Sequence, residues 1–135
     1  MSGASGQDAL FGGDGADRLV GSTGLDSLTG GNGADVFDFD SFSGAADADL
    51  ILDFTSGTDQ IWLRGFYFGD LQDGALNPAA FAEGTQAQQA DDRILYDQAT
   101  GALMFDADGS GLIAALLMAT LTPGTLLTAA DFLVV

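Results

Sequence analysis

The sequence contains no cysteine, no histidine and no lysine. Without cysteine and histidine, the chain cannot form a disulfide, a zinc site of the usual Cys/His kind, a thiol nucleophile or a Ser-His-Asp triad. A secreted protein without disulfides needs another means of stabilising its fold. Hard metal ions, which bind oxygen ligands, are the obvious candidates.

Positive charge is also scarce. Three Arg stand against 20 acidic residues, and the formal net charge is −17. Such a surface repels phosphate backbones and anionic lipid, so nucleic acid and membrane surfaces are disfavoured as partners, whereas cations are attracted. The acidic residues are 19 Asp and a single Glu, Glu83. The shorter carboxylate is typical of turns and of oxygen ligation close to backbone carbonyls.

Long apolar runs are missing as well. The residues that follow Met1 are Gly-rich and have neither the basic start nor the apolar stretch of a signal peptide. The longest apolar-rich stretch, Leu112–Leu121, is too short to cross a bilayer, so we expect no stable membrane insertion. A length of 135 residues with 47% apolar residues suits one compact domain with a real core.

A repeat with a period of nine runs from Gly3 to Asp38. Its copies are GASGQDALF (Gly3–Phe11), GGDGADRLV (Gly12–Val20), GSTGLDSLT (Gly21–Thr29) and GGNGADVFD (Gly30–Asp38). Every copy has Gly at positions 1 and 4, Asp at position 6 and a large apolar residue at position 8. In that order of positions, these residues are Gly3, Gly12, Gly21 and Gly30; Gly6, Gly15, Gly24 and Gly33; Asp8, Asp17, Asp26 and Asp35; and Leu10, Leu19, Leu28 and Phe37.

Each shared position has a physical role. Gly permits positive φ and close backbone approach, so a turn built on it can point several carbonyl oxygens inward. The Asp adds a carboxylate, and the result is an all-oxygen cage suited to the 6–8 ligands of Ca²⁺. The apolar residue at position 8 is expected to point into the core. A flexible Gly/Asp-rich linker is the alternative, but a linker has no reason to keep a period of nine or an apolar position 8.

The copies differ at positions 2 and 3. Position 2 is Gly in the second and fourth copies (Gly13 and Gly31), but Ala4 in the first and Ser22 in the third. We therefore expect looser cages in the first and third copies. Position 3 carries an oxygen-bearing side chain in every copy, with Asp14 and Asn32 in the two stronger ones.

These residues resemble the RTX nonapeptide family, GGxGxDxUx, which forms calcium-binding parallel β-structures. The resemblance implies that two nonapeptides make one coil and that several Ca²⁺ ions lie between turns stacked on the same side. Asp8 and Asp26 would then line one side, and Asp17 and Asp35 the other. It implies Asp14 and Asn32 as additional oxygen donors.

The segment after the repeats predicts strands over Val36–Phe39, Leu50–Phe54 and Ile61–Leu63, with a turn at Thr55–Asp59. It resembles the D-F-x-x-G-x-D segment that closes the roll in serralysin-type metalloproteases. The resemblance implies Asp53 and Asp59 as metal ligands and Asp49 as a weaker one. Ordinary turn chemistry is the alternative.

The remaining sequence predicts further β-structure. Asn77 and Pro78 predict a short helical turn, and Arg93–Asp97 with Ala102–Asp106 predict a hairpin. Leu112–Leu121 predicts a strand, although its Ala and Leu content leaves a helix open. We expect an all-β protein: a parallel β-roll of two short sheets over residues 3–63, continuing into an antiparallel, β-sandwich-like cap over residues 64–135.

The run Asp106–Gly111 is similar to the start of an EF-hand loop. Its Gly109 stands one position after Asp108, which breaks the EF-hand spacing, and position 117 is Leu instead of the closing Glu. A turn at the exit of the hairpin is the better interpretation. Asp106 and Asp108 are retained as ligands of a weak extra metal site.

The C-terminal residues are Asp131, Phe132, Leu133, Val134 and Val135. An acidic residue before four apolar ones resembles the uncleaved export signal of type I secretion substrates. The resemblance implies an exporter as partner (ABC transporter, adaptor and outer-membrane channel) and an extracellular location for a protein of a Gram-negative bacterium. The local alternative is a capping box of Thr128 and Asp131 followed by a last strand. We expect deletion of this tail to leave the folded core intact.

The predicted function is that of a calcium-binding module, not an enzyme in its own right. Calcium at extracellular concentrations would drive folding, and any catalytic activity would lie in an upstream passenger domain. The alternative is an adhesive, surface-layer or carbohydrate-associated spacer on the same β-roll. Paired carboxylates could serve a glycosidase, but the repeat already accounts for the Asp positions and the sequence offers no other catalytic set.

Overall fold

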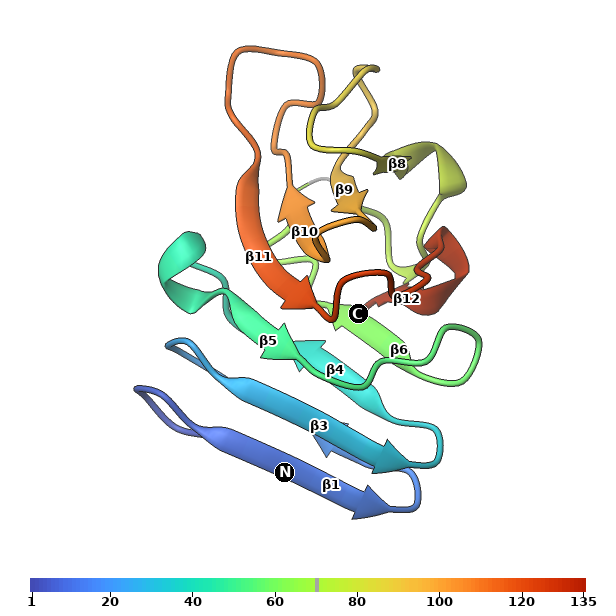
Figure 1. The fold of residues 1–135 in the computed structure, drawn as a ribbon. Helices are drawn as coiled ribbons and strands as arrows, with labels where there is room; N and C mark the ends of the chain where they lie inside the picture. Colours follow the sequence, from blue (N-terminus) through green and yellow to red (C-terminus); the bar gives the residue numbers. More distant parts are fainter. Residues whose placement is uncertain (70) are drawn as a thin grey trace.

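The nonapeptide repeats wind the chain into coils whose strands alternate between two facing sheets (Figure 1). The computed structural model describes residues 1–69 and 71–135. The first coil holds β1 (Ala9–Asp14) and β2 (Arg18–Leu19), and the second holds β3 (Ser27–Asn32) and β4 (Val36–Phe39). Leu10 pairs with Leu28 and Leu19 with Phe37, in parallel. In both pairs the partner lies two repeats later in the chain, so two nonapeptides do form one coil.

The third coil is longer than the first two. Its strands are β5 (Asp49–Ile51) and β6 (Gln60–Leu63), which pair in parallel with β3 and β4. Leu28 lies opposite Ile51 and Phe37 opposite Ile61, so each pair spans more of the sequence than two repeats. The extra residues form a loop that contains the 3-10 helix η1 (Ala45–Asp47). The predicted third-coil strands are therefore present, but the first starts at Asp49 and ends at Ile51.

The cap adds strands to both sheets of the roll. The larger sheet has the order β1-β3-β5-β11-β10-β9-β8 and the smaller β2-β4-β6-β12-β7. The added elements are β7 (Gly74–Ala75), η2 (Pro78–Ala80), β8 (Phe81–Glu83), β9 (Ile94–Asp97), β10 (Ala102–Phe105), β11 (Leu116–Leu121), η3 (Ala129–Asp131) and β12 (Phe132–Val134). The predicted hairpin is confirmed as antiparallel β9 and β10, and Asn77 caps η2 through Oδ1. In the described part of the chain, no helix is long and apolar enough to cross a membrane.

The strand predicted over Leu112–Leu121 forms only in its second half, as β11. Leu112 and Ile113 are exposed in the loop between β10 and β11. Their apolar character is therefore not evidence of burial, because a run of apolar residues does not distinguish a strand from an exposed apolar loop. The choice between strand and helix is settled in favour of the strand by the pairing of β11 with β5 and β10.

A single core runs through the roll and the cap. The position 8 residues form its part within the roll, and Leu19, Leu28 and Phe37 are at most 1% exposed. Cap residues such as Leu103 and Phe132 belong to the same cluster of buried side chains. Because β11 and β12 pair with β5 and β6, the sheets continue across the boundary between residues 63 and 64.

Two ion pairs to one buried carboxylate tie the three coils together on the smaller sheet. The Asp38 side chain on β4 is fully buried and accepts hydrogen bonds from Arg18 on β2 and from Arg64 after β6. The Nε atoms of the two Arg lie 2.7 and 3.0 Å from the carboxylate oxygens. The hydrogen bond to Asp38 raises the pKa of Arg64. The guanidinium carbon of Arg18 also lies 5.8 Å from the centre of the Trp62 ring. Two of the three Arg in the sequence therefore bind Asp38.

The tail is an interior strand, which contradicts the premise that its residues are loosely held and can be deleted without effect on the core. Strand β12 lies between β6 and β7 in the smaller sheet. Phe132 and Val134 are each 2% exposed. Pairing with β6, a strand from the third coil of the roll, holds the tail in place: Phe132 lies opposite Ile61.

Candidate metal sites

The turns of successive coils stack into two columns, one on each side of the roll. We name them the first column (Gly3–Asp8, Gly21–Asp26 and the loop ending at Asp49) and the second column (Gly12–Asp17, Gly30–Asp35 and the turn ending at Asp59). In the first column, the amide of Asp8 donates to Asp26 Oδ1 at 2.8 Å and that of Asp26 to Asp49 Oδ1 at 3.0 Å. The second column has the same series of hydrogen bonds from the amide of one Asp to the carboxylate of the next, which we call the Asp ladder. Asp17 donates to Asp35 Oδ1 at 2.9 Å, and Asp35 to Asp59 Oδ1 at 3.0 Å.

The Asp ladder uses one oxygen, Oδ1, of each carboxylate that accepts in it, and Asp8 and Asp17 contribute only their amides. The Oδ2 atoms of Asp17, Asp26 and Asp35 are buried and have no hydrogen-bond partner. Asp26 and Asp35 are each only 1% exposed. A buried charged oxygen without a partner is costly, and a cation is the partner that a carboxylate oxygen can accept.

The glycine at position 1 provides the space in which oxygens converge. A Cβ on Gly12 would lie 2.8 Å from Asp17 Oδ2 and 2.5 Å from the Gly30 carbonyl oxygen. A Cβ on Gly21 would lie 2.5 Å from Asp26 Oδ2 and 2.6 Å from an Asp49 carboxylate oxygen. Carboxylate and carbonyl oxygens therefore meet where a side chain would otherwise stand. This oxygen-only donor set fits Ca²⁺.

The glycine at position 4 allows the turns of one column to stack. Gly24 and Gly33 have φ values of 122° and 127°. A Cβ on either would collide with the carbonyl oxygen of the position 4 glycine one coil earlier, Gly6 or Gly15. The spacing between coils, and hence the distance between oxygens in successive turns, depends on these missing side chains.

Burial makes three carboxylates of the columns harder to ionise. It raises the pKa of Asp49 to about 7, against the lowering effect of the Asp26 amide. Negative charges on three neighbours raise this pKa further: Asp26, Asp47 and Asp40. Burial also raises the pKa of Asp26 and Asp59. The columns thus concentrate negative charge in a poorly solvated place, which favours a bound cation or a proton.

In calcium-depleted buffer, we expect the β-sheet signal in circular dichroism to increase as the pH falls from about 7.5 to about 5. The pKa of Asp49 in the folded state, about 7, lies above the ordinary value of 3.8. The folded state therefore binds the proton more tightly, and this stabilisation is lost as the pH rises through about 7. The variant Asp49→Asn should show a weaker pH dependence. An equal dependence in both proteins would contradict this prediction.

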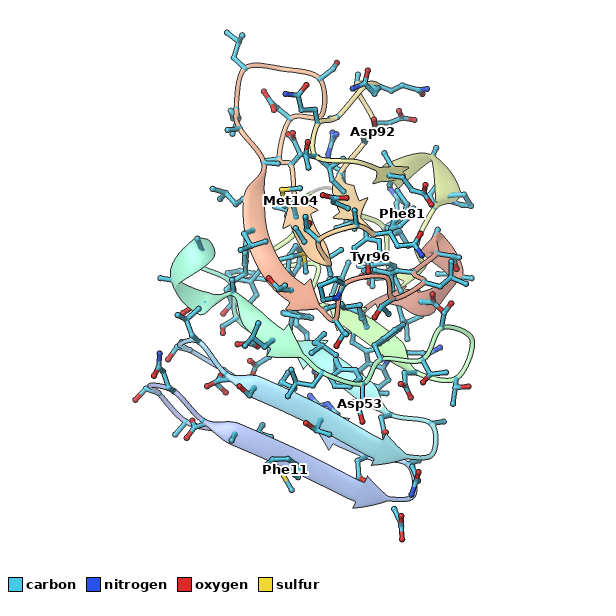
Figure 2. All side chains as sticks on the ribbon, in the orientation of Figure 1. Phe11, Asp53, Phe81, Asp92, Tyr96 and Met104 are labelled. Carbon is cyan, nitrogen blue, oxygen red and sulfur yellow. The ribbon has the colours of Figure 1, made fainter. Side chains whose placement is uncertain are left out.

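Several predicted ligands have their oxygens bonded elsewhere and lie outside the cradles, as we name the spaces beside the position 1 glycines where oxygens converge. Asp53 uses both oxygens on backbone amides, accepting from Gly30 at 2.9 Å and from Gly31 at 2.7 Å. It therefore ties the third coil to the second (Figure 2). Asp14 and Asn32 are exposed and pair with each other, with 2.9 Å between Asn32 Nδ2 and Asp14 Oδ1. Asp59 has its second oxygen 2.8 Å from the amide of Thr55.

The two Asp of the EF-hand-like run lie in the cap, in the loop between β10 and β11. The structure confirms the turn. The amide of Asp108 donates to Asp106 Oδ1 at 3.2 Å, and Ile113 donates to Asp108 Oδ2 at 3.0 Å. Burial raises the pKa of Asp106, whereas the Ile113 amide lowers that of Asp108. This loop lies at the opposite end of the molecule from β1 (Figure 1), so it is separate from the columns.

Two carboxylates that were not among the predicted ligands close the columns. Asp47 at the end of η1 accepts from the amide of Gly24 at 3.0 Å, and Asp131 at the end of η3 accepts from that of Gly57 at 2.9 Å. Gly24 and Gly57 both stand two positions before the Asp of their turn. The sequence carried a signal for this shared role, because Ala-Ala-Asp occurs at both 45–47 and 129–131. Asp40 was also missed, and its Oδ1 is buried without a partner.

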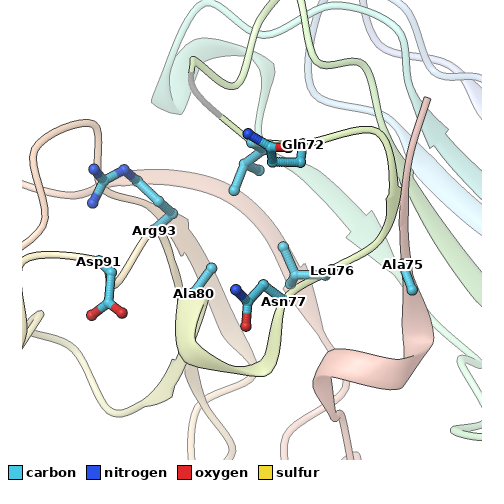
Figure 3. A pocket seen from close by; sticks show the side chains of 8 residues that line it. Gln72, Ala75, Leu76, Asn77, Ala80, Asp91 and Arg93 are labelled. Carbon is cyan, nitrogen blue, oxygen red and sulfur yellow. The ribbon is translucent and has the colours of Figure 1, made fainter.

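No cluster of three or more acidic side chains able to hold a metal occurs within residues 1–69 and 71–135. The candidate sites instead combine one or two carboxylates with backbone carbonyls. A separate surface pocket of about 270 Å³ lies in the cap (Figure 3). Asp91 and Arg93 are its charged residues, beside Leu76, Asn77 and Ala80, and this mixed lining indicates no particular ligand.

The sequence profile of the family described as Peptidase M10 serralysin C terminal matches residues 3–134. No curated protein matches the chain. Among solved structures, the chain is similar to the AlgE6R3 subunit from the Azotobacter vinelandii mannuronan C5-epimerase, with a TM-score of 0.48 and 23% sequence identity. That similarity covers 98% of this chain and 76% of the subunit.

Proposed function

Because the chain belongs to the serralysin C-terminal family of RTX-type modules, found in secreted bacterial proteins, we propose that it is a calcium-binding module that folds on reaching extracellular Ca²⁺. It would serve as the C-terminal folding and secretion module of a type I exported protein. Catalytic activity would belong to an upstream domain. The observation that carries this proposal is the set of three buried, unpartnered carboxylate oxygens, on Asp17, Asp26 and Asp35.

The residues of the columns oppose folding when no cation is present. Ordering the Gly-rich turns costs backbone entropy, and bringing the acidic residues together costs electrostatic free energy. When bound, Ca²⁺ would supply the positive charge that these oxygens lack. The position 1 glycines keep the space open, and the Asp ladder holds each carboxylate in register with the next coil.

The same dependence of folding on calcium would also keep the chain unfolded for export. At the low free calcium of a cytoplasm the chain would remain largely unfolded, so a transporter could bind the C-terminal residues. Outside the cell, sites with affinities of about 10⁻⁴–10⁻³ M would fill and stabilise the fold. In the folded chain Asp131, Phe132 and Val134 are buried, so we propose that the exporter binds the tail before folding.

Calorimetric titration with CaCl₂ tests the proposal. We expect Asp35→Ala to raise the calcium midpoint roughly tenfold, the change produced by losing about 1.4 kcal/mol of binding free energy. Asp91→Ala is the matched control, since it removes the same charge from an exposed position in the cap. Absence of calcium binding by the unaltered chain, or equal effects of the two substitutions, would contradict the proposal.

A further inference from the structure

Apart from Asp49, which ends the longer loop that contains η1, five Asp occupy the same place at the end of a column turn but differ in their second oxygen. The Oδ2 atoms of Asp17, Asp26 and Asp35 have no partner. Those of Asp8 and Asp59 each accept a hydrogen bond from an amide four positions earlier, which is position 2 of the turn. Ala4 donates to Asp8 Oδ2 at 2.9 Å, and Thr55 to Asp59 Oδ2 at 2.8 Å.

The backbone of the position 2 residue separates the two groups. In the turns with a free Oδ2, this residue has positive φ: 104° at Gly13, 74° at Ser22 and 99° at Gly31. Ser22 is the only non-Gly residue with positive φ in the described part of the chain, so Ala4 and Thr55 are not in this region. The φ angle sets the direction of the N–H relative to the chain that follows. A Cβ makes positive φ unfavourable, so Ala and Thr keep the N–H directed at the carboxylate.

The closed arrangement also occurs outside the repeats. Asp47 Oδ2 accepts from the Ser43 amide at 3.1 Å, and Asp92 Oδ2 from the Gln88 amide at 2.8 Å. In both cases the donor lies four positions before the Asp. This hydrogen bond therefore recurs where an Asp ends a short turn, and it is absent from the three turns with positive φ at position 2.

We propose that the backbone conformation at position 2 decides whether a turn offers its carboxylate to a calcium ion. This inference rests on the proposed function. With positive φ, the Asp Oδ2 is open to the ion; otherwise the turn's own amide occupies it. The turns of Asp17, Asp26 and Asp35 are open, and those of Asp8 and Asp59 are closed.

This rule separates two copies that had both been expected to form looser cages. The third copy keeps positive φ at Ser22, at the cost of backbone strain, and its Asp26 Oδ2 is free. In the first copy, the Ala4 amide occupies Asp8 Oδ2, the oxygen that would otherwise bind the ion. Its cradle is otherwise built, because a Cβ on Gly3 would lie 2.8 Å from Asp8 Oδ2 and 2.7 Å from the Gly21 carbonyl oxygen.

Two opposite substitutions test the rule in the full chain. Ala4→Gly allows positive φ in the first turn, and Gly13→Ala disfavours it in the second. An added Cβ at Gly13 has no atom within 4 Å, so this substitution challenges only the backbone. Gly84→Ala is the matched control, since Gly84 has φ 113°, equally open surroundings and a place in the cap.

The number of Ca²⁺ ions bound per chain is measured by native mass spectrometry and calorimetry at saturating CaCl₂. We expect one more ion than in the unaltered chain for Ala4→Gly and one fewer for Gly13→Ala, with no change for Gly84→Ala. Adding Asp8→Asn to Ala4→Gly should remove the extra ion. If the unaltered chain binds calcium but neither position 2 substitution changes the count, the inference is wrong and the proposed function stands. If the unaltered chain binds none, the proposed function itself fails.

Discussion

Removal of calcium with a chelator is expected to abolish most of the far-UV circular dichroism signal of β-structure. The net charge is −17, and the column carboxylates are buried with unpartnered oxygens. A domain of this size has only about 5–15 kcal/mol of stability, and each buried, unsatisfied polar group costs about 1–3 kcal/mol. Three such oxygens are therefore enough to remove a large part of the stability. The fluorescence of Trp62, the sole Trp, should follow the same transition.

Two controls separate specific binding from general screening of charge. Millimolar CaCl₂ should restore the signal, whereas MgCl₂ at equal concentration should not, because Mg²⁺ requires a small, nearly octahedral site. NaCl at about 0.15 M, where the screening length is about 8 Å, should also fail to restore it, since buried charges are screened poorly. A full β-sheet spectrum in excess chelator, or recovery with NaCl alone, would rule out folding driven by calcium.

Deletion of residues 131–135 is expected to unfold the chain even at saturating calcium. The deletion removes strand β12 from between β6 and β7, and with it the buried side chains of Phe132 and Val134. Truncating one buried Phe costs about 3–5 kcal/mol, so the whole strand approaches the total stability of a small domain. The Gly57 amide and Ser56 hydroxyl would also lose their acceptor, Asp131. Urea unfolding of the truncated chain, followed by circular dichroism, measures the effect.

Single substitutions separate the structural role of the tail from its proposed role in export. Phe132→Ala should lower the urea midpoint strongly. Val135→Asp should hardly change it, because Val135 is 37% exposed and contributes backbone hydrogen bonds to Leu63 and Gly65. In a strain with a type I exporter, Val135→Asp should reduce secretion although the purified protein folds normally in calcium. Normal secretion of this variant would leave the tail with a structural role alone.

The nonapeptide repeat predicted the β-roll through its resemblance to the RTX family, and the pairing of the strands confirms it. Contacts between coils join residues two repeats apart, such as Leu10 with Leu28 and Gly6 with Gly24. Because every copy makes the same contacts with the next, the residues shared at positions 1, 4, 6 and 8 carry the geometry in the sequence. The oxygen-only chemistry followed in the same way from the absence of Cys and His and the excess of Asp.

The state of each carboxylate oxygen depends on the folded backbone. Asp8 and Asp26 occupy the same repeat position, yet one Oδ2 is bonded and the other free. The difference arises from φ at Ala4 and Ser22, and neither residue is the expected glycine. A pattern of residue types does not say which of two such replacements will accept a strained conformation, because the surrounding coils decide that.

The ends of the columns and the position of the tail depend on contacts that no repeat encodes. Asp131 accepts a hydrogen bond from Gly57, and Phe132 pairs with Ile61, so both contacts join the tail to the third coil across the whole cap. These contacts are not repeated from one nonapeptide to the next, so no comparison between the copies reveals them. The sequence therefore predicted the repeating coil and an oxygen-only donor set suited to a hard cation. Only the tertiary structure decided which turns are open to that cation and that the C-terminal tail completes the sheet.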